Sequence, residues 1–197
     1  MGPGFDAKTA LVVVDMQNDF ADPAGALSVR DAEAVFPALE ALLAQATEAG
    51  SVVVYTKDWH PPTTPHFKAN GGIWPPHCVQ NTWGAQLHPA LPRVSPAVFI
   101  HKGQAQVDGY SAFTVIDPVT SASHETGLRA LLQRFGVERV VVAGLATDYC
   151  VKHTALDARH FGFETRVAKD AVRAVDLQPE DGERALAEMA RAGATLF

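Results

Sequence analysis

The sequence predicts an α/β fold, a doubly wound and mainly parallel β-sheet with helices on both faces. Short apolar runs rich in β-branched residues alternate along the chain with segments whose apolar residues recur at helical spacing. Three of these runs are apolar throughout, as expected for strands buried on both faces of a parallel sheet. Such alternation is typical of strands joined by right-handed helical crossovers.

Five strands are expected, each a short apolar run bounded by polar or turn-forming residues. The first, second and fourth are the continuously apolar ones. The runs cover residues 10–15, 51–57, 97–102, 139–144 and 163–169.

Helices are expected between these strands, because apolar residues recur there every three or four positions. The first ends near Gly50 and the second near Gly136, since glycine is common just past a helix C-terminus. The last begins at about Pro179, because proline favours the first turn of a helix. The expected helices cover residues 35–46, 128–135, 151–162 and about 179–193.

The segment 58–96 departs from this alternation. It is rich in proline, histidine and glycine, and it contains the three tryptophans of the chain. A loop of this length is usually functional or disordered, and its tryptophans argue against disorder. We therefore expect one domain over residues 1–197, in which 58–96 is a long loop that serves the functional site.

Composition and charge argue against several classes of protein. A net charge of −6 gives no electrostatic reason to expect nucleic acid or an anionic membrane as a partner. No apolar run approaches the roughly 20 residues needed to cross a bilayer, and the first ten residues lack the features of a signal peptide. Two cysteines are too few for a disulfide framework. These features predict a cytoplasmic globular protein, and they leave a homo-oligomer open.

Four reactive side chains fall at the ends of four expected strands. Asp15 ends the first, Asp58 follows the second, Lys102 ends the third and Cys150 lies just after the fourth. Open α/β sheets bind ligands outside the carboxyl ends of their strands. Any one of these residues alone could be a cap or a solvated turn residue, but the four together predict one shared crevice.

Cys150 is the candidate nucleophile, because it lies between a buried strand and an expected helix in GLATDYCVKHTALDA (144–158). A helix N-terminus favours a thiolate, and its backbone N–H groups can stabilise an oxyanion. An aspartate could take the thiol proton and a lysine could stabilise the thiolate, and Asp15 and Lys102 are the candidates. Spacing alone assigns neither role. Cys78 is interpreted as a small buried hydrophobic residue.

A second group of candidate residues lies in the long loop. Asp58 and His60 are two positions apart, which places them on the same side of an extended backbone, and His66 and His77 follow. Carboxylate and imidazole ligands suit zinc, iron or manganese. The alternative is that these histidines cap turns and bond to the backbone. That interpretation is kept for His88, His101, His124, His153 and His160.

The chain resembles the nicotinamidases, also called pyrazinamidases, of the isochorismatase-like cysteine hydrolases. Six motifs carry the resemblance, in the family's order and over nearly the whole chain. They are VVVDMQNDF (12–20), KDWHPPTTPHF (57–67), WPPHCV (74–79), HKG (101–103), DGYSAF (108–113) and AGLATDYCV (143–151).

The resemblance implies a role for each catalytic residue. It makes Asp15 the general acid/base, Lys102 its triad partner and Cys150 the nucleophile. It also implies a cis peptide bond between Leu145 and Ala146, with an oxyanion hole formed by the N–H groups of Ala146 and Cys150. The implied reaction is hydrolysis of nicotinamide to nicotinate and ammonia through a cysteine thioester, as part of NAD salvage, with pyrazinamide hydrolysed to pyrazinoate.

The resemblance also implies one divalent metal ion that anchors the pyridine nitrogen, with zinc the first choice and iron or manganese possible. Its ligands would be Asp58, His60 and His77, whereas His66 matches a position that ligates metal in only some relatives. The ring of the substrate would be lined by Phe20, Trp74 and Tyr110, although plain core packing is a serious alternative for Phe20.

The sequence is also compatible with three alternatives. An enzyme of the same superfamily could act on another substrate, either as an amidohydrolase of another small amide or N-carbamoyl compound, or on an isochorismate-like vinyl ether. A non-catalytic binding protein could have kept the fold, but an intact Asp15, Lys102 and Cys150 argues against it. A metal-storage protein is a poor match for a single site in 197 residues.

Overall fold

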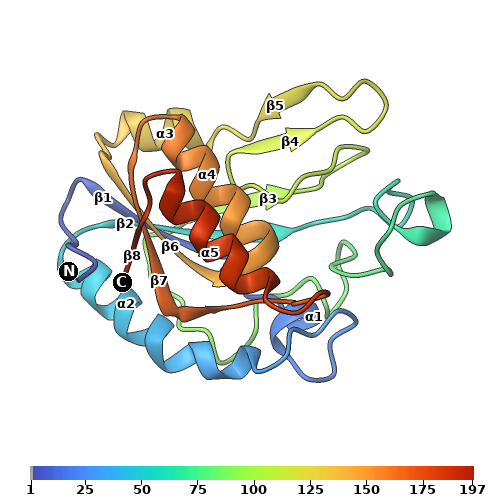
Figure 1. The fold of residues 1–197 in the computed structure, drawn as a ribbon, viewed down its shortest axis with the longest axis horizontal. Helices are drawn as coiled ribbons and strands as arrows, with labels where there is room; N and C mark the ends of the chain where they lie inside the picture. The colour runs from blue at the N-terminus through green and yellow to red at the C-terminus, as the bar shows by residue number, and fades with distance from the viewer. Residues whose placement is uncertain (1) are drawn as a thin grey trace.

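The computed structural model of the protein describes residues 2–197 and contains a six-stranded sheet in the order β3-β2-β1-β6-β7-β8 (Figure 1). Every pairing within this sheet is parallel. Its strands are β1 (Thr9–Val14), β2 (Val52–Asp58), β3 (Val98–Lys102), β6 (Arg139–Leu145), β7 (Glu164–Arg173) and β8 (Thr195–Leu196).

Helices cover both faces of the sheet, so the predicted doubly wound α/β class is confirmed (Figure 1). The helix α2 packs on one face, and α3, α4 and α5 pack on the other. The α-helices are α1 (Asn18–Ala21), α2 (Phe36–Glu48), α3 (Leu128–Arg134), α4 (Lys152–His160) and α5 (Asp181–Arg191). Short helical turns of other types cover Ala32–Val35, Lys68–Asn70 and Thr147–Val151.

The central strand β1 is buried along its whole length. Leu11 and Val13 belong to the apolar core under α2, whereas Val12 and Val14 belong to the core under α3, α4 and α5. Successive side chains of a strand point to opposite faces, so a strand between two cores must be apolar at every position. This is the physical reason for the uninterrupted apolar run at the start of the sequence.

The structure contains two pieces of β-structure that the sequence analysis does not predict. An antiparallel pair, β4 (Thr114–Ile116) and β5 (Ser123–Glu125), projects from the main sheet (Figure 1). The residues of β5 are exposed and polar, so no apolar pattern marks them. The other piece is β8, a two-residue strand that pairs with β7 at the edge of the sheet.

The carboxyl ends of the parallel strands meet at one edge of the sheet, and the chain between β2 and β3 runs across this edge (Figure 1). The register places Asp58 directly beside Lys102, while Val14, the residue before Asp15, lies beside Gly144. The fold therefore brings the four strand ends with reactive side chains into one neighbourhood. Within residues 2–197, no helix combines the length and the apolar character that a bilayer crossing requires.

Candidate active site

The side chain of Lys102 lies at the centre of the site and is fully buried. Its Nζ lies 2.6 Å from Asp15 Oδ2 and 2.9 Å from Asp58 Oδ1. The same ammonium donates to Cys150 Sγ at 3.3 Å and to the Tyr110 carbonyl oxygen at 2.9 Å. The four residues expected at strand ends therefore share one crevice, and the lysine connects the two carboxylates to the thiol.

Asp15 is held by the neighbouring strand as well as by the lysine. Its backbone has a φ of 46°, a left-handed conformation that aspartate tolerates better than most residues. The Asp15 N–H donates to Thr56 Oγ1 at 3.1 Å, and the Thr56 hydroxyl donates to Asp15 Oδ1 at 2.5 Å. Oδ1 is thus occupied by Thr56, while Oδ2 faces Lys102.

Burial and charge set the protonation states of this group. Burial raises the pKa of the Cys150 thiol well above its ordinary value, and Lys102 only partly opposes this. Burial also raises the pKa of Asp15. Burial alone would lower the pKa of Lys102, but Asp15 and Asp58 raise it well above its ordinary value. The resting site thus contains a lysine cation and a protonated thiol, which needs a base before it can attack.

Cys150 lies in the helical turn Thr147–Val151 between β6 and α4, which agrees with the predicted place at a strand-to-helix junction. The turn is tied to the chain that follows β7. Asp148 Oδ1 accepts the Val175 N–H at 3.0 Å, and its Oδ2 accepts the Asp176 N–H at 2.9 Å. One carboxylate therefore fixes the Val175 segment beside the thiol.

The peptide bond between Leu145 and Ala146 is cis, as the resemblance implies. The Ala146 carbonyl oxygen accepts the N–H groups of Tyr149 and Val151, so the backbone folds closely around this residue. Ala146 and Cys150 both line the same cavity. Their position is compatible with an oxyanion hole at the start of the turn.

Three buried histidines form a cluster beside the Lys102 group. One ring nitrogen from each of His60, His66 and His77 lies within 4.8 Å of the others. His77 Nδ1 lies 2.8 Å from the Pro75 carbonyl oxygen, which leaves Nε2 for another partner. His66 Nδ1 lies 2.6 Å from Asp108 Oδ2, which again leaves Nε2. The structure therefore groups His66 with the two expected histidine ligands.

The cluster fits a divalent metal ion. Among the described residues, neither ring nitrogen of the buried His60 has a hydrogen-bond partner, and its Nε2 lies 3.7 Å from Asp58 Oδ2. A buried polar group without a partner is rare and needs a reason, and a bound ion supplies one. Burial lowers the pKa of His77 to about 4, so at neutral pH its nitrogen keeps the lone pair that a metal requires.

Gly103 is required for the position of His60. A Cβ atom at Gly103 would lie 2.4 Å from His60 Cε1, and the φ of Gly103 is +66°. Any larger residue would displace the ring and would also strain the backbone. The glycine of HKG thus allows His60 to pack directly against the end of β3.

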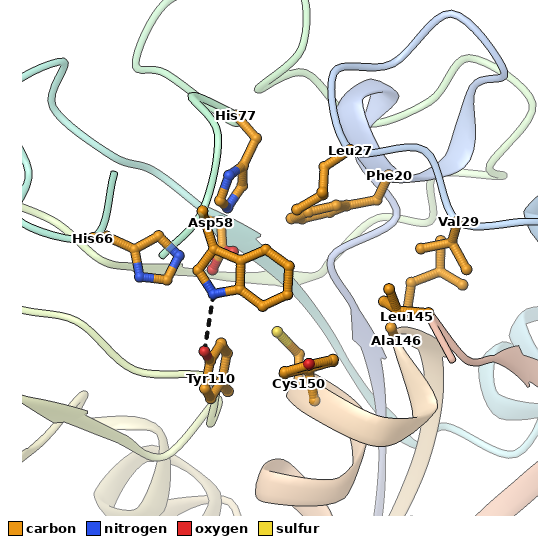
Figure 2. A pocket seen from close by; sticks show the side chains of 13 residues that line it. Phe20, Leu27, Val29, Asp58, His66, His77, Tyr110, Leu145, Ala146 and Cys150 are labelled. Atoms are coloured by element: carbon orange, nitrogen blue, oxygen red, sulfur yellow. Dashed lines mark hydrogen bonds between the residues drawn. The ribbon is translucent and has the colours of Figure 1, made fainter. Parts of the chain in front are cut away.

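A cavity lies between the thiol and the histidines. Figure 2 shows Cys150, His66 and His77 converging on it, with Phe20 and Tyr110 at its sides. Burial raises the pKa of Tyr110 to about 12, so its hydroxyl stays neutral. This hydroxyl accepts a hydrogen bond from Nε1 of Trp74, which also lines the cavity. All three aromatic residues expected around a substrate ring therefore line it.

Sequence reasoning missed several residues of the site. Leu27 and Val29 lie in the loop after α1, where no periodic pattern marks them. Asp108 begins the motif DGYSAF (108–113), but its contact with His66 depends on two loops that are distant in the sequence. The residues that line the cavity without having been expected are Leu27, Val29, Leu145, Tyr149 and Val175.

Among the described residues, the cluster of His60, His66 and His77 does not include the histidines that were expected to cap turns or bond to the backbone. These are His88, His101, His124, His153 and His160. The ring of His101 stacks on Trp59 with centroids 4.9 Å apart. His88 Nε2 lies 3.5 Å from Asp22 Oδ2. Cys78 is fully buried and unpaired among residues 2–197, in keeping with its interpretation as a core residue.

Comparison with known proteins gives consistent similarities in sequence and structure. Residues 9–197 match the family described as the isochorismatase domain. The nicotinamidase of Escherichia coli (strain K12) is 39% identical over 204 residues, which cover 95% of this chain and 93% of that protein. The crystal structure of the pyrazinamidase of Pyrococcus horikoshii in complex with zinc has a TM-score of 0.86 at 40% identity, with 96% and 98% of the chains covered. The crystal structure of PnC1 from L. infantum in complex with nicotinate has a TM-score of 0.89 at 37% identity, with 100% and 96% covered.

Proposed function

The chain belongs to the isochorismatase family, and from this premise we propose that it is a nicotinamidase, which hydrolyses nicotinamide to nicotinate and ammonia. The proposal extends to pyrazinamide, which carries the same carboxamide on a similar ring. The similar E. coli protein is a nicotinamidase, and the similar L. infantum structure holds nicotinate. These two similarities support nicotinamide as the substrate and nicotinate as the product.

One observation carries the proposal. The buried Lys102 ammonium contacts Asp15, Asp58 and Cys150 at once, and the last two line a cavity whose walls include aromatic rings and histidines. A buried thiol beside a base and a cation is equipped for nucleophilic attack. Aromatic walls and histidine nitrogens suit a flat ring with a nitrogen acceptor.

The first half of the proposed reaction forms a thioester. Asp15 removes the proton from the Cys150 thiol, and Lys102 stabilises the resulting thiolate through the contact at 3.3 Å. The sulfur attacks the carboxamide carbon, and the N–H groups of Ala146 and Cys150 stabilise the oxyanion. Asp15 then returns the proton to the nitrogen, and ammonia leaves. Each oxyanion donor is worth about 2.7–4 kcal/mol of barrier.

The second half releases the acid. A water molecule attacks the thioester carbon while Asp15 accepts its proton, and Asp15 then passes that proton to the departing Cys150 sulfur, which leaves as the thiol. Throughout both halves Lys102 remains charged, because the two carboxylates keep its pKa high. Asp15 therefore serves both as the acid and as the base. A carboxyl group with a raised pKa can fill both roles.

A divalent metal, with zinc preferred to iron or manganese, would be held by Asp58, His60 and His77 together with His66. The chemistry it would supply is coordination of the pyridine nitrogen, directly or through water, which fixes the ring. With the ring held in this way, its carboxamide would face Cys150 Sγ, and such positioning lowers the barrier to attack. Zinc in the similar Pyrococcus structure supports this choice of metal.

We also propose that the enzyme acts in NAD salvage in the cytoplasm. Recycling of nicotinamide yields nicotinate, a precursor of pyridine nucleotides. Both cysteines are free and buried, as suits a reducing compartment.

The direct test measures ammonia release from nicotinamide, pyrazinamide and an N-carbamoyl compound, and formation of the hydrolysis products of isochorismate, each with and without a chelator. The proposal expects turnover of the two aromatic amides and a large loss of turnover when the metal is removed. Restoration by added zinc separates loss of metal from damage to the protein. Turnover of only the N-carbamoyl compound or isochorismate would contradict it.

Replacing His60 with alanine is expected to reduce bound metal and to raise KM for nicotinamide, because the variant loses a nitrogen at the centre of the cluster. The ion pairs of Lys102 do not involve this residue, so the fold should persist. Elemental analysis of the purified variant measures the metal content. His88→Ala is the matched control, since that buried histidine lies beside Asp22, away from the cluster. Unchanged metal content in His60→Ala would show that the ligand assignment is wrong.

A further inference from the structure

Asp108 makes a contact that the proposed reaction does not use. Its Oδ2 lies 2.6 Å from His66 Nδ1, and its Oδ1 accepts the Gly109 N–H at 2.7 Å. Its backbone forms a bridge with Ile116 in β4, where the Asp108 N–H donates to the Ile116 carbonyl at 2.7 Å. Both the side chain and the backbone of Asp108 are therefore fixed.

We propose that Asp108 is a positioning residue, which holds His66 so that its Nε2 serves as a fourth protein ligand of the metal. This inference rests on the metal site of the proposed function. A neutral imidazole carries one proton, so a carboxylate that accepts an N–H from Nδ1 leaves the Nε2 lone pair free. Outer carboxylates of this kind fix the tautomer and the orientation of a ligating histidine.

The surroundings of His66 support an orienting role over a simple ion pair. The side chain of Asp108 is 31% exposed and that of His66 is 4% exposed, so water screens the carboxylate, and an ion pair there would add little stability. The His66 ring stacks on His60 with centroids 4.7 Å apart and an interplanar angle of 16°. With the ring plane set by this stacking, the remaining freedom is a flip that exchanges Nδ1 and Nε2, and Asp108 opposes that flip.

Among the described residues, neither of the other two histidines of the cluster forms a hydrogen bond to a carboxylate. His77 Nδ1 is fixed by the backbone carbonyl of Pro75, and no nitrogen of His60 has a hydrogen-bond partner among the described residues. A carboxylate raises the basicity of a ligating histidine. His66 is therefore the ligand that depends most on a replaceable side chain, and Asp108→Ala should expose that dependence.

Zinc affinity provides the first test. The full-length apo protein is titrated with zinc alone against a chromophoric chelator, as wild type, Asp108→Ala, Asp108→Asn, His66→Ala and the double variant. We expect Asp108→Ala to weaken binding about 10- to 100-fold and Asp108→Asn to weaken it less, because the amide oxygen still accepts the N–H. The double variant, Asp108→Ala with His66→Ala, should bind zinc no more weakly than His66→Ala alone. The reason is that the two substitutions remove the same interaction. Asp22→Asn, which alters the carboxylate beside His88, is the matched control and should bind as wild type.

The tautomer of His66 provides a readout that a merely structural role would not change. Nitrogen-15 NMR of the apo protein should show His66 protonated at Nδ1 in wild type and in Asp22→Asn. In Asp108→Ala the signal should shift toward a mixture of the two tautomers. Circular dichroism confirms that each variant is folded, and Asp108→Asn keeps the test open if the alanine variant fails to fold.

Several outcomes would overturn the inference. Wild-type zinc affinity in Asp108→Ala, additive losses in the double variant, or an unchanged tautomer would each do so. Wild-type affinity in His66→Ala would show that His66 is not a ligand. These measurements require no substrate, so the positioning role stands or falls separately from nicotinamide hydrolysis.

Discussion

Replacing Cys150 with alanine is expected to abolish ammonia release from nicotinamide, with a loss on the order of 10⁴-fold or more. The thiol is the group in the cavity that can form the covalent intermediate, and the side chain of alanine has no nucleophile. Steady-state ammonia release and mass spectrometry of the protein after a rapid quench measure the two consequences, lost turnover and lost acyl-enzyme.

The control for this variant is Cys78→Ala, which removes the other buried thiol of the chain. Cys78 lies in the core, so its loss should cost about 1 kcal/mol of stability or less and leave the thioester chemistry intact. Substantial turnover by Cys150→Ala, or an acyl adduct that forms on Cys78, would contradict the assignment of the nucleophile.

Replacing Lys102 with methionine is expected to reduce both activity and stability strongly. The variant keeps Asp15 and Asp58 buried but removes the cation that lies 2.6 and 2.9 Å from them. Removal of one partner of a buried pair typically costs about 3–5 kcal/mol, because the other charge stays buried without compensation. Turnover should fall as well, since the thiolate loses its neighbouring cation. Urea unfolding and ammonia release measure the two effects.

The stability deficit of Lys102→Met should depend on pH in a definite direction. In the wild type the pKa of Lys102 is raised above its value in the unfolded chain. Its contribution to the free energy of unfolding is therefore fully present below about pH 10.4, and it is lost as the pH rises through the folded-state pKa. In the variant the pKa values of Asp15 and Asp58 should rise. Their protonation at low pH removes the uncompensated charges, so the deficit should shrink as the pH falls.

Lys57→Met is the control for these measurements. Lys57 lies one residue before Asp58 on the same strand, but its Nζ lies over the Trp59 ring, 4.3 Å from the centroid. Its loss should change stability by less than about 1 kcal/mol and leave activity intact. Equal effects of the two lysine variants, or a deficit at Lys102 that does not vary with pH, would contradict the central role of Lys102.

The fold could be predicted from the sequence largely because its central strands lie between two cores. The run at β1 is apolar from Ala10 to Val14 because it lies between the two cores, and Gly50 and Gly136 follow the ends of α2 and α3. The pair β4–β5 has no such mark. Its strands are three residues long, and their pairing is set by contacts that no local pattern records.

The candidate site also contains residues that the sequence predicts and residues that it does not. The rule that ligands bind at strand ends brought Asp15, Lys102 and Cys150 together, whereas their individual roles came only with the family resemblance. Residues placed by non-local hydrogen bonds were missed. Val175 reaches the cavity because Asp148 accepts its N–H, and Asp108 reaches His66 across two loops. Nothing in the composition of either segment indicates these contacts.

The candidate histidine ligands fall in one continuous stretch from His60 to His77, whereas Asp15, Asp58, Lys102 and Cys150 lie at or just after four separate strand ends. Chemistry and substrate anchoring are therefore encoded in different ways. The proposed acyl-transfer residues are attached to the sheet, whereas the three histidines of the proposed anchor lie in a single insert between two adjacent strands. Exchange of that insert between relatives is expected to redirect substrate choice while the nucleophile stays in place, so new specificities can arise on this scaffold without a new catalytic centre.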